Sequence, residues 1–361
     1  MVNLLILLSS YLLSVAAATY PSTCSYFTGK KHDISNLLSL KALNHTCHGQ
    51  TNIYQIRMSP GKGLGVFALH DLEVGTVIMR EAPILKIKPP KYAKGSGYPM
   101  AAVSQMLRQD YAFLSTEDQE EVMSLAYYGT EEEKNASDPL GLIFRTNAYK
   151  SGEEIGLFPK IARINHSCRP NTSYYWNAQL NLRVMYANRK IKKGEEILDS
   201  YISLLLPQEE RQKLLKPYGF TCNCEVCSAR KKARRESDRR RTTIKKGFVK
   251  LAPQLTLGVP ADNEAKKQAA EDARLSAQLA ELVEKEGLAD YYATAYRTAA
   301  LSFARVEDWQ SATIWANKGY EWRVMEDPTS SYALEMHKLT SDFIEQWKSE
   351  LRKKSLLKDG I

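Results

Sequence analysis

The stretch Asn165-His166-Ser167-Cys168-Arg169-Pro170-Asn171 decides the fold of this chain. Three other short strings accompany it in the sequence. Gly61-Lys62-Gly63-Leu64-Gly65-Val66-Phe67 lies upstream, Gly194-Glu195-Glu196-Ile197-Leu198-Asp199-Ser200-Tyr201 follows, and a Cys-x-Cys-x-x-Cys cluster comprises Cys222, Cys224 and Cys227. Each string alone has an ordinary explanation, such as a hairpin turn or a tight polar turn. Their combination in this order is specific.

Together the four strings resemble the SET-domain lysine methyltransferases, over about Asn52 to Ser228. The resemblance implies an α+β fold of small sheets, a β-clip with knot-like threading, which is an exception to unknotted chain topology. It also implies a post-SET zinc segment after the sheets. The chain is most similar to the SET-and-MYND branch of the family. Residues 48–167 contain no cysteine, so the MYND finger of that branch is absent.

The resemblance implies S-adenosylmethionine as cofactor. In the family, the glycine-rich turn wraps the cofactor through its backbone, and the Asn-His pair holds the methionine and adenine portions. The cofactor contacts expected here are Lys62, Gly63, Leu64, Arg163, Asn165, His166 and Phe220.

Tyr201 is the expected catalytic residue, because it ends the active-site string of the family. The preceding Leu198-Asp199 departs from the commoner pair of threonine and an apolar residue, which leaves the local packing of this strand open. A purely structural tyrosine is the alternative. Tyr218 and Asn147 are expected to line the substrate channel, and for Tyr218 and Phe220 simple packing is the competing interpretation.

Four cysteines form a thiolate set suited to structural zinc with tetrahedral geometry: Cys168, Cys222, Cys224 and Cys227. The cluster at 222–227 alone would also fit a redox-active pair or a disulfide scaffold. The fourth ligand, Cys168, comes from the family resemblance. Zinc bound there would hold the segment that carries Tyr218 and Phe220 over the cofactor site.

The chemistry that the resemblance implies needs few protein groups. A sulfonium methyl donor leaves as a neutral thioether, so no general acid is required. The acceptor lysine must lose its proton, which costs about 4–5 kcal/mol at neutral pH for a pKa near 10.4. A dry aromatic channel lowers that pKa, because burial disfavours the ammonium form. A tyrosine hydroxyl and backbone carbonyls then orient the amine.

Periodicity divides the chain into several segments. Short apolar runs rich in β-formers predict strands at 66–69, 76–79, 84–87, 181–186 and 196–201. The expected domains are a SET domain at 52–206 with a helical insert at about 98–140, a post-SET zinc segment at 207–228, a basic linker at 229–260 and an all-α domain at 261–361. Within the last, 3.6-residue periodicity predicts two helices joined at Val306-Glu307-Asp308, a tetratricopeptide-like hairpin.

The net charge of +9 lies in one strip. Residues 228–250 hold eleven Lys or Arg against Glu236 and Asp238, so this strip alone carries +9 and the remainder is close to neutral. The strip is either an exposed connector or a helix. It is a candidate site for nucleic acid or an acidic partner, or for nuclear import; a solvated helix face is the alternative.

The first residues indicate a different location. Leu4 to Ala18 is an apolar run that ends in three alanines, which predicts a signal peptide at 1–18, followed by an N-terminal arm at 19–51. The prediction places the protein in the secretory pathway, and nucleus or cytoplasm are the alternatives. Cys24 and Cys47 could then pair, and the sequons at Asn44, Asn135 and Asn171 become relevant, although a glycan at Asn171 would obstruct the cofactor motif. No membrane span is expected in the mature chain.

Three functions compete at this stage. The first is an S-adenosylmethionine-dependent methyltransferase that acts on a protein lysine. The second is a methyltransferase for a non-protein amine or other small molecule. The third is a catalytically silent SET module that binds a partner, against which the intact Asn165, His166 and Tyr201 argue. The sequence leaves the substrate, the degree of methylation and the oligomeric state open.

Overall fold

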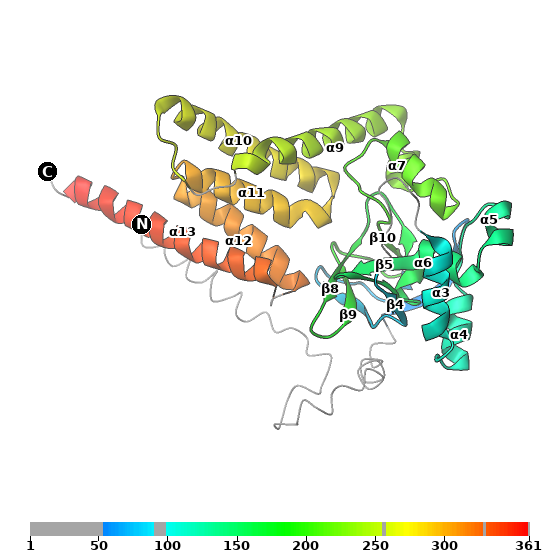
Figure 1. Cartoon of the computed structure of the whole chain (residues 1–361). Helices are drawn as coiled ribbons and strands as arrows, with labels where there is room; N and C mark the ends of the chain where they lie inside the picture. Colours follow the sequence, from blue (N-terminus) through cyan, green and yellow to red (C-terminus); the bar gives the residue numbers. More distant parts are fainter. Residues whose placement is uncertain (1–52, 90–98, 255–257, 328–329, 360–361) are drawn as a thin grey trace, which may run out of the picture. The chain divides into compact units, whose positions relative to one another are not determined.

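The computed structural model describes residues 53–89, 99–254, 258–327 and 330–359 (Figure 1). The predicted signal peptide (1–18), the N-terminal arm (19–51) and the Cys24 and Cys47 pair lie outside these residues. Among the helices of the described residues, none combines the length and hydrophobicity that a membrane span requires.

In the part of the chain that the structure describes, ten short strands form three small sheets. The four-stranded sheet has the order β1-β2-β10-β7, and the three-stranded sheets have the orders β3-β9-β8 and β4-β6-β5. The strands are β1 (Tyr54–Ser59), β2 (Gly63–Ala68), β3 (Val77–Glu81), β4 (Leu85–Ile87), β5 (Ala148–Ser151), β6 (Glu154–Leu157), β7 (Asn165–His166), β8 (Thr172–Asn177), β9 (Leu182–Ala187) and β10 (Glu196–Asp199).

Strand β10 brings three of the sequence strings together. It pairs antiparallel with β2, where Glu196 is opposite Phe67. On its other side it pairs in parallel with β7, where Leu198 is opposite Asn165 and Asp199 is opposite His166. The glycine-rich turn, the Asn-His pair and the approach to Tyr201 therefore meet in one sheet, although they are far apart in the sequence.

The helical insert follows β4. It consists of α3 (Met100–Tyr111), α4 (Thr116–Met123), α5 (Glu131–Ala136) and α6 (Pro139–Asn147). Side-chain caps begin three of these helices: Ser115 accepts from the backbone of Asp118, Thr130 and Glu133 form a capping box, and Asp138 caps α6. The buried apolar side chains of α3, α4 and α6 pack with those of β4 in one hydrophobic cluster.

The basic strip forms a helix. Of the two interpretations of residues 228–250, the exposed connector is wrong: α9 (Lys231–Leu251) runs through them, after α7 (Gln208–Leu215) and α8 (Glu225–Ser228). One face of α9 is buried, with Ile244 and Leu251 in the same hydrophobic cluster as Cys168. The region 229–260 is therefore largely a packed helix.

The remaining helices confirm that the C-terminal region is helical. They are α10 (Asn263–Glu286), α11 (Tyr292–Arg305), α12 (Trp309–Glu326) and α13 (Ser331–Asp359). The predicted junction at 306–308 separates α11 from α12. Small buried side chains, among them Ala300, Ala304, Ala312 and Ala316, allow these helices to pack closely.

A buried carboxylate links α9 and α10 to the Asn-His-Ser-Cys string. Glu286, at the end of α10, is fully buried and pairs with Arg241 at 2.9 Å and Arg240 at 2.7 Å. Burial raises the pKa of Glu286, but Ser237 and Arg241 outweigh it and hold the pKa below its ordinary value. Arg241, also fully buried, donates to the backbone carbonyl of Cys168 at 2.8 Å. One guanidinium thus joins the helical region to the Asn-His-Ser-Cys string.

Removing the charge of Glu286 is expected to destabilise the protein strongly. Glu286→Gln leaves the buried guanidinium of Arg241 without its counter-ion, which costs about 3–5 kcal/mol in other buried pairs. Chemical denaturation should show this loss. Glu271→Gln is the matched control on the same helix, because Glu271 pairs with Arg274 at the surface; its effect should stay within about 1 kcal/mol. Equal midpoints for the two variants would contradict the prediction.

Candidate functional site

Asn165 fastens the glycine-rich turn to strand β10. Its side-chain nitrogen donates to the carbonyl of Leu64 at 3.0 Å and to Glu196 at 2.9 Å. The other carboxylate oxygen of Glu196 pairs with Lys62 at 2.8 Å. Gly65 is required by this close approach, since a Cβ there would lie 2.6 Å from Glu196 and 2.9 Å from the Asn165 amide. Glu196 is a site residue that the sequence analysis did not single out.

His166 connects the site to the cysteine cluster. Its Nδ1 accepts from the backbone N–H of Tyr201 at 3.1 Å, and its Nε2 lies 3.5 Å from the sulfur of Cys168. Burial lowers the pKa of His166 to about 4, so the ring is neutral near pH 7. Because Nδ1 accepts, the ring proton is on Nε2 and is directed to the sulfur. Both ring nitrogens therefore have partners within the chain.

Tyr201 lies two residues beyond β10 and is held at both ends. Its hydroxyl donates to the carbonyl of Ile164 at 2.7 Å. Its ring centroid lies 5.0 Å from that of Tyr218, 5.4 Å from that of His166 and 6.3 Å from that of Phe220. The hydroxyl of Tyr218 in turn donates to the backbone carbonyl of Tyr201 at 3.4 Å. Tyr201, His166, Tyr218 and Phe220 thus form one aromatic cluster.

The surroundings of Tyr201 keep its hydroxyl protonated. Burial, followed by the charges of Asp199, Tyr218 and Glu196, raises the pKa of Tyr201 above its ordinary value. The phenol is therefore neutral near pH 7. Since its proton is donated to Ile164, its oxygen lone pairs remain available as acceptors. A neutral phenol held in this way can orient a donor group but cannot act as a strong base.

The loop between α4 and α5 contributes to the site and was missed by the sequence analysis. Arg163 donates to the backbone and the hydroxyl of Ser124. The side-chain amide of Asn147, at the end of α6, donates to the carbonyl of Ala126 in this loop and to the carbonyl of Ile143 in α6. It therefore anchors the loop to α6. The ring of Tyr128 lies against Gly219, where a Cβ would come within 2.3 Å of it. A larger residue at Gly219 would displace the loop that precedes Phe220.

Two site residues expose apolar surface. Leu64 and Phe220 are 40% and 36% exposed, although both side chains are large and hydrophobic. Gly63 has a φ of +77° and open space where a Cβ would be. An exposed aromatic ring beside His166 and a turn with an accessible backbone fit a cofactor that combines an adenine ring with polar groups.

The four predicted metal-ligand cysteines meet at one point. Their sulfur atoms all lie within 4.8 Å of one another, and the sulfur of Cys168 is 4.0 Å from that of Cys222 and 3.6 Å from that of Cys227. Four sulfurs around one zinc at 2.3 Å would be about 3.8 Å apart. The hydrogen bonds of Cys168, Cys222 and Cys227 lower the pKa of Cys224, which favours a thiolate. This donor set fits zinc.

Polar side chains from α7 and α9 surround the cysteines. Gln212 exchanges two hydrogen bonds with the backbone of Cys222, at 2.8 and 2.9 Å. Gln208 donates to the carbonyl of Cys227 at 3.0 Å. The buried guanidinium of Arg211 interacts with the sulfurs of Cys168 and Cys227. Arg211 and Arg241 place two positive charges beside a four-thiolate group, whose zinc complex would carry two negative charges.

A second set of buried polar and aromatic side chains surrounds the end of β10. Asp199, the last residue of β10, is fully buried and accepts from the backbone of Ser200 at 2.6 Å. Burial raises the pKa of Asp199 to about 8, with Asp290 contributing. Arg183, 1% exposed, lies 4.5 Å from the ring centres of Tyr149 and Tyr174. The pKa of Tyr149 is raised by burial and by the charges of Asp199 and Tyr201. Tyr149 is thus an aromatic neighbour of the site that the sequence analysis did not identify.

Asn171, the last residue of the motif, is fully buried. Its amide nitrogen donates to the carbonyl of Glu196 at 2.8 Å, and its oxygen accepts from the backbone of Leu198 at 2.7 Å. It therefore holds β10 to the segment that follows β7, and it has no surface on which a glycan could be carried.

Protein made in a secretory host should test this. Folded protein is expected to carry no glycan at Asn171, because a glycan there would prevent β10 from pairing. Asn135 is the internal control, since its sequon is exposed on α5. Peptide mass spectrometry with glycosidase treatment measures both sites. A glycan at Asn171 in folded protein would show that the motif tolerates disruption of these hydrogen bonds.

The geometry and the sequence now identify the domain. Residues 63–202 match the SET domain family model. This part of the chain is therefore a SET domain, and its sequence is similar to parts of curated lysine methyltransferases.

Three curated relatives illustrate the similarity. The histone-lysine N-methyltransferase set5 of Schizosaccharomyces pombe is 34% identical over 198 residues, which cover 54% of this chain and 57% of that protein. The human N-lysine methyltransferase SMYD2 is 42% identical over 77 residues, 21% of this chain and 17% of that protein. The human histone-lysine N-methyltransferase SMYD3 is 40% identical over 88 residues, 24% and 20% of the two chains. The matched part thus spans about half or less of each relative.

Proposed function

We propose that this protein transfers a methyl group from S-adenosylmethionine to the side-chain nitrogen of a protein lysine. The observation that carries the proposal is the environment of Tyr201: its hydroxyl is fixed by Ile164, its ring is flanked by Tyr218 and Phe220, and its backbone is bonded to the Asn-His pair. The names of the relatives, which are lysine methyltransferases, agree with a lysine of a protein as acceptor.

S-adenosylmethionine supplies, when bound, a methyl group on a sulfonium, whose thioether product is neutral and needs no proton. The residues that would hold it are the turn at Lys62, Gly63 and Leu64, together with Arg163, Asn165, His166 and Phe220. Asn165 already uses its amide to position the turn, and both ring nitrogens of His166 have partners. These two residues therefore support the cofactor site chiefly through backbone groups and ring faces.

The chain's own contribution to the reaction is to keep the lysine amine neutral and to orient it. An aromatic environment of the kind around Tyr201 disfavours an ammonium group and lowers the pKa of a lysine that enters it. The Tyr201 oxygen can accept a hydrogen bond from the amine, since its own proton is engaged with Ile164. This contact would align the nitrogen lone pair with the methyl group.

We further propose that Cys168, Cys222, Cys224 and Cys227 hold a structural zinc ion. The four ligands leave no open position for catalysis, as is usual in structural sites. The metal would fix α8 and the preceding segment with Tyr218 and Phe220 against the motif that begins at Asn165. Its role is therefore to keep the aromatic cluster assembled.

The decisive experiment is methyl transfer with a labelled cofactor and a proteome extract, read by mass spectrometry. Label on lysine side chains of proteins supports the proposal. Label confined to the small-molecule fraction would favour methylation of a non-protein amine, and no label in either fraction, with the cofactor bound, would favour a silent binding module. Tyr201→Phe is the control for background labelling.

A further inference from the structure

Helix α9 carries a row of cations that do not take part in the contacts described above. Six of them are exposed and form no ion pair within the part of the chain that the structure describes; they are Lys231, Lys232, Arg235, Arg239, Lys245 and Lys246. Lys250 continues the row and lies 3.9 Å from Asp272. The other arginines of the helix behave differently, since Arg240 and Arg241 pair with Glu286 and Arg234 donates to the carbonyl of Cys227 at 3.4 Å.

Five of these seven cations share one narrow face of the helix. With 100° per residue, Lys232, Arg235, Arg239, Lys246 and Lys250 fall within a sector of about 60°. The opposite face is buried through Ser237, Arg241, Ile244 and Leu251. Because that face is packed, the basic face has a fixed orientation. At 1.5 Å per residue, it extends for about 28 Å between Lys231 and Lys250.

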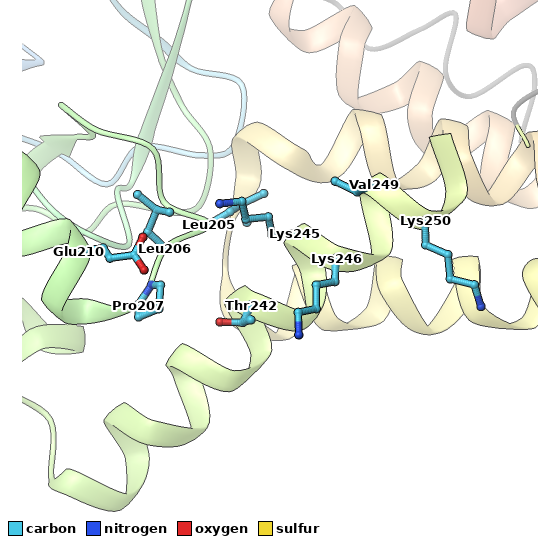
Figure 2. A pocket seen from close by; sticks show the side chains of 9 residues that line it. All are labelled: Leu205, Leu206, Pro207, Glu210, Thr242, Lys245, Lys246, Val249 and Lys250. Carbon is cyan, nitrogen blue, oxygen red and sulfur yellow. The ribbon is translucent and has the colours of Figure 1, made fainter. Parts of the chain in front are cut away.

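Two shallow hollows lie along this row. One, of about 450 Å³, is lined by Lys231, Lys232, Arg235, Glu236 and Arg239. The second, of about 440 Å³, lies between α9 and the start of α7 (Figure 2); its lining residues are Leu205, Leu206, Pro207, Glu210, Thr242, Lys245, Lys246, Val249 and Lys250. Figure 2 shows Lys246 and Lys250 on the same stretch of α9 as Val249. The row is thus a surface that a ligand can approach closely.

We propose that this basic face of α9 binds the phosphate backbone of duplex DNA. Duplex DNA presents a negative charge for each 1.7 Å of its axis, so it can engage the whole row in any register. An acidic protein segment would need carboxylates that match the spacing of six particular side chains. No aromatic residue lies among the cations between Lys231 and Lys246, which disfavours single strands, since these are held largely by base stacking.

The proposal predicts binding without sequence preference. Lys and Arg contacts to phosphates carry no direct sequence information, and the row offers no asparagine or glutamine to read adenine. The inference does not depend on methyl transfer, because none of the six cations touches the candidate site. A DNA partner agrees with the nuclear alternative among the locations predicted from the sequence.

The test is binding of the full chain to a fluorescent 24-base-pair duplex, measured by anisotropy between 50 and 300 mM NaCl without cofactor. Six phosphate contacts predict that log K falls with log[salt] with a slope of about −5. The variant Arg235→Gln/Arg239→Gln/Lys246→Gln should reduce the slope to about −3 and weaken binding at least about tenfold at 100 mM salt. Its thermal melting should match that of the parent, since all three side chains are exposed.

A matched control removes three exposed cations elsewhere: Lys192→Gln/Lys193→Gln/Lys338→Gln. Its Kd for the duplex should lie within about twofold of that of the parent, which distinguishes an effect of this face of α9 from an effect of total charge.

Absence of duplex binding at 100 mM salt, or equal losses in both triple variants, overturns the proposal. Tighter binding of polyglutamate or of phosphatidylserine vesicles than of duplex also overturns it, in favour of an acidic protein or a membrane surface. If the first triple variant does not fold, Lys232→Gln/Lys245→Gln replaces it. Methyl transfer by the parent is scored separately, so either proposal can fail alone.

Discussion

Cys224→Ser is expected to release the zinc ion and to lower the thermal stability of the protein sharply. The variant retains three of the four ligands, whose sulfur atoms converge within 4.8 Å in the parent. Without metal, three thiols remain beside the charged guanidinium groups of Arg211 and Arg241. Loss of a structural metal belongs to the few mechanisms that destabilise a protein by about 4 kcal/mol or more.

The measurements are metal content by mass spectrometry and thermal unfolding. We expect about one equivalent of zinc in the parent and much less in the variant, together with weaker binding of the cofactor, since Tyr218 and Phe220 precede the cluster. Ser228→Ala is the control: its hydroxyl donates to the Cys224 carbonyl at an exposed position, so the metal content and the melting temperature should be nearly unchanged. One equivalent of zinc retained in Cys224→Ser, with unchanged melting, would contradict the zinc proposal.

Short motifs predicted the assembly of this site because their residues do the pairing themselves. The Asn-His pair is β7, and the string that ends in Tyr201 contains β10, so the parallel pairing of Leu198 with Asn165 joins them directly. The strands predicted from apolar runs near 66–69, 181–186 and 196–201 correspond to β2, β9 and β10. In these segments the local pattern and the tertiary contacts agree.

Other contacts could not be predicted, because they depend on residues that are distant in the sequence. The ion pair between Arg241 and Glu286 joins two helices, and nothing in the basic strip distinguishes Arg241 from its exposed neighbours except its helical face. Asp199 departs from the family pattern, and the structure places it beside a buried network rather than in solvent. Strand β8, with three aromatic residues, was missed because its alternation is irregular.

Tyr201→Phe is expected to abolish most turnover while it leaves cofactor binding nearly unchanged. The substitution removes one hydroxyl, and with it the hydrogen bond to Ile164 and the acceptor for the lysine amine. The ring remains, so its packing on Tyr218 and Phe220 is preserved. Loss of a single positioned polar group at the reacting centre costs about 10²–10³ in kcat. We therefore expect a loss of this size, with a cofactor Kd within about threefold of the parent.

His166→Ala should show the opposite pattern to Tyr201→Phe, because its main effect should be on cofactor binding. It deletes the acceptor for the Tyr201 backbone N–H and the partner of Cys168, so the cofactor Kd should rise by at least about tenfold. Calorimetry measures binding, and single-turnover methyl transfer at saturating cofactor measures the chemical step. If Tyr201→Phe weakens cofactor binding as much as His166→Ala, the hydroxyl is structural. Because the Tyr201 phenol is protonated well above neutral pH, the rate of the parent should also show no titration of this group between pH 6 and 9. A rate that rises as the Tyr201 phenolate forms in that range would mean that Tyr201 acts as a base.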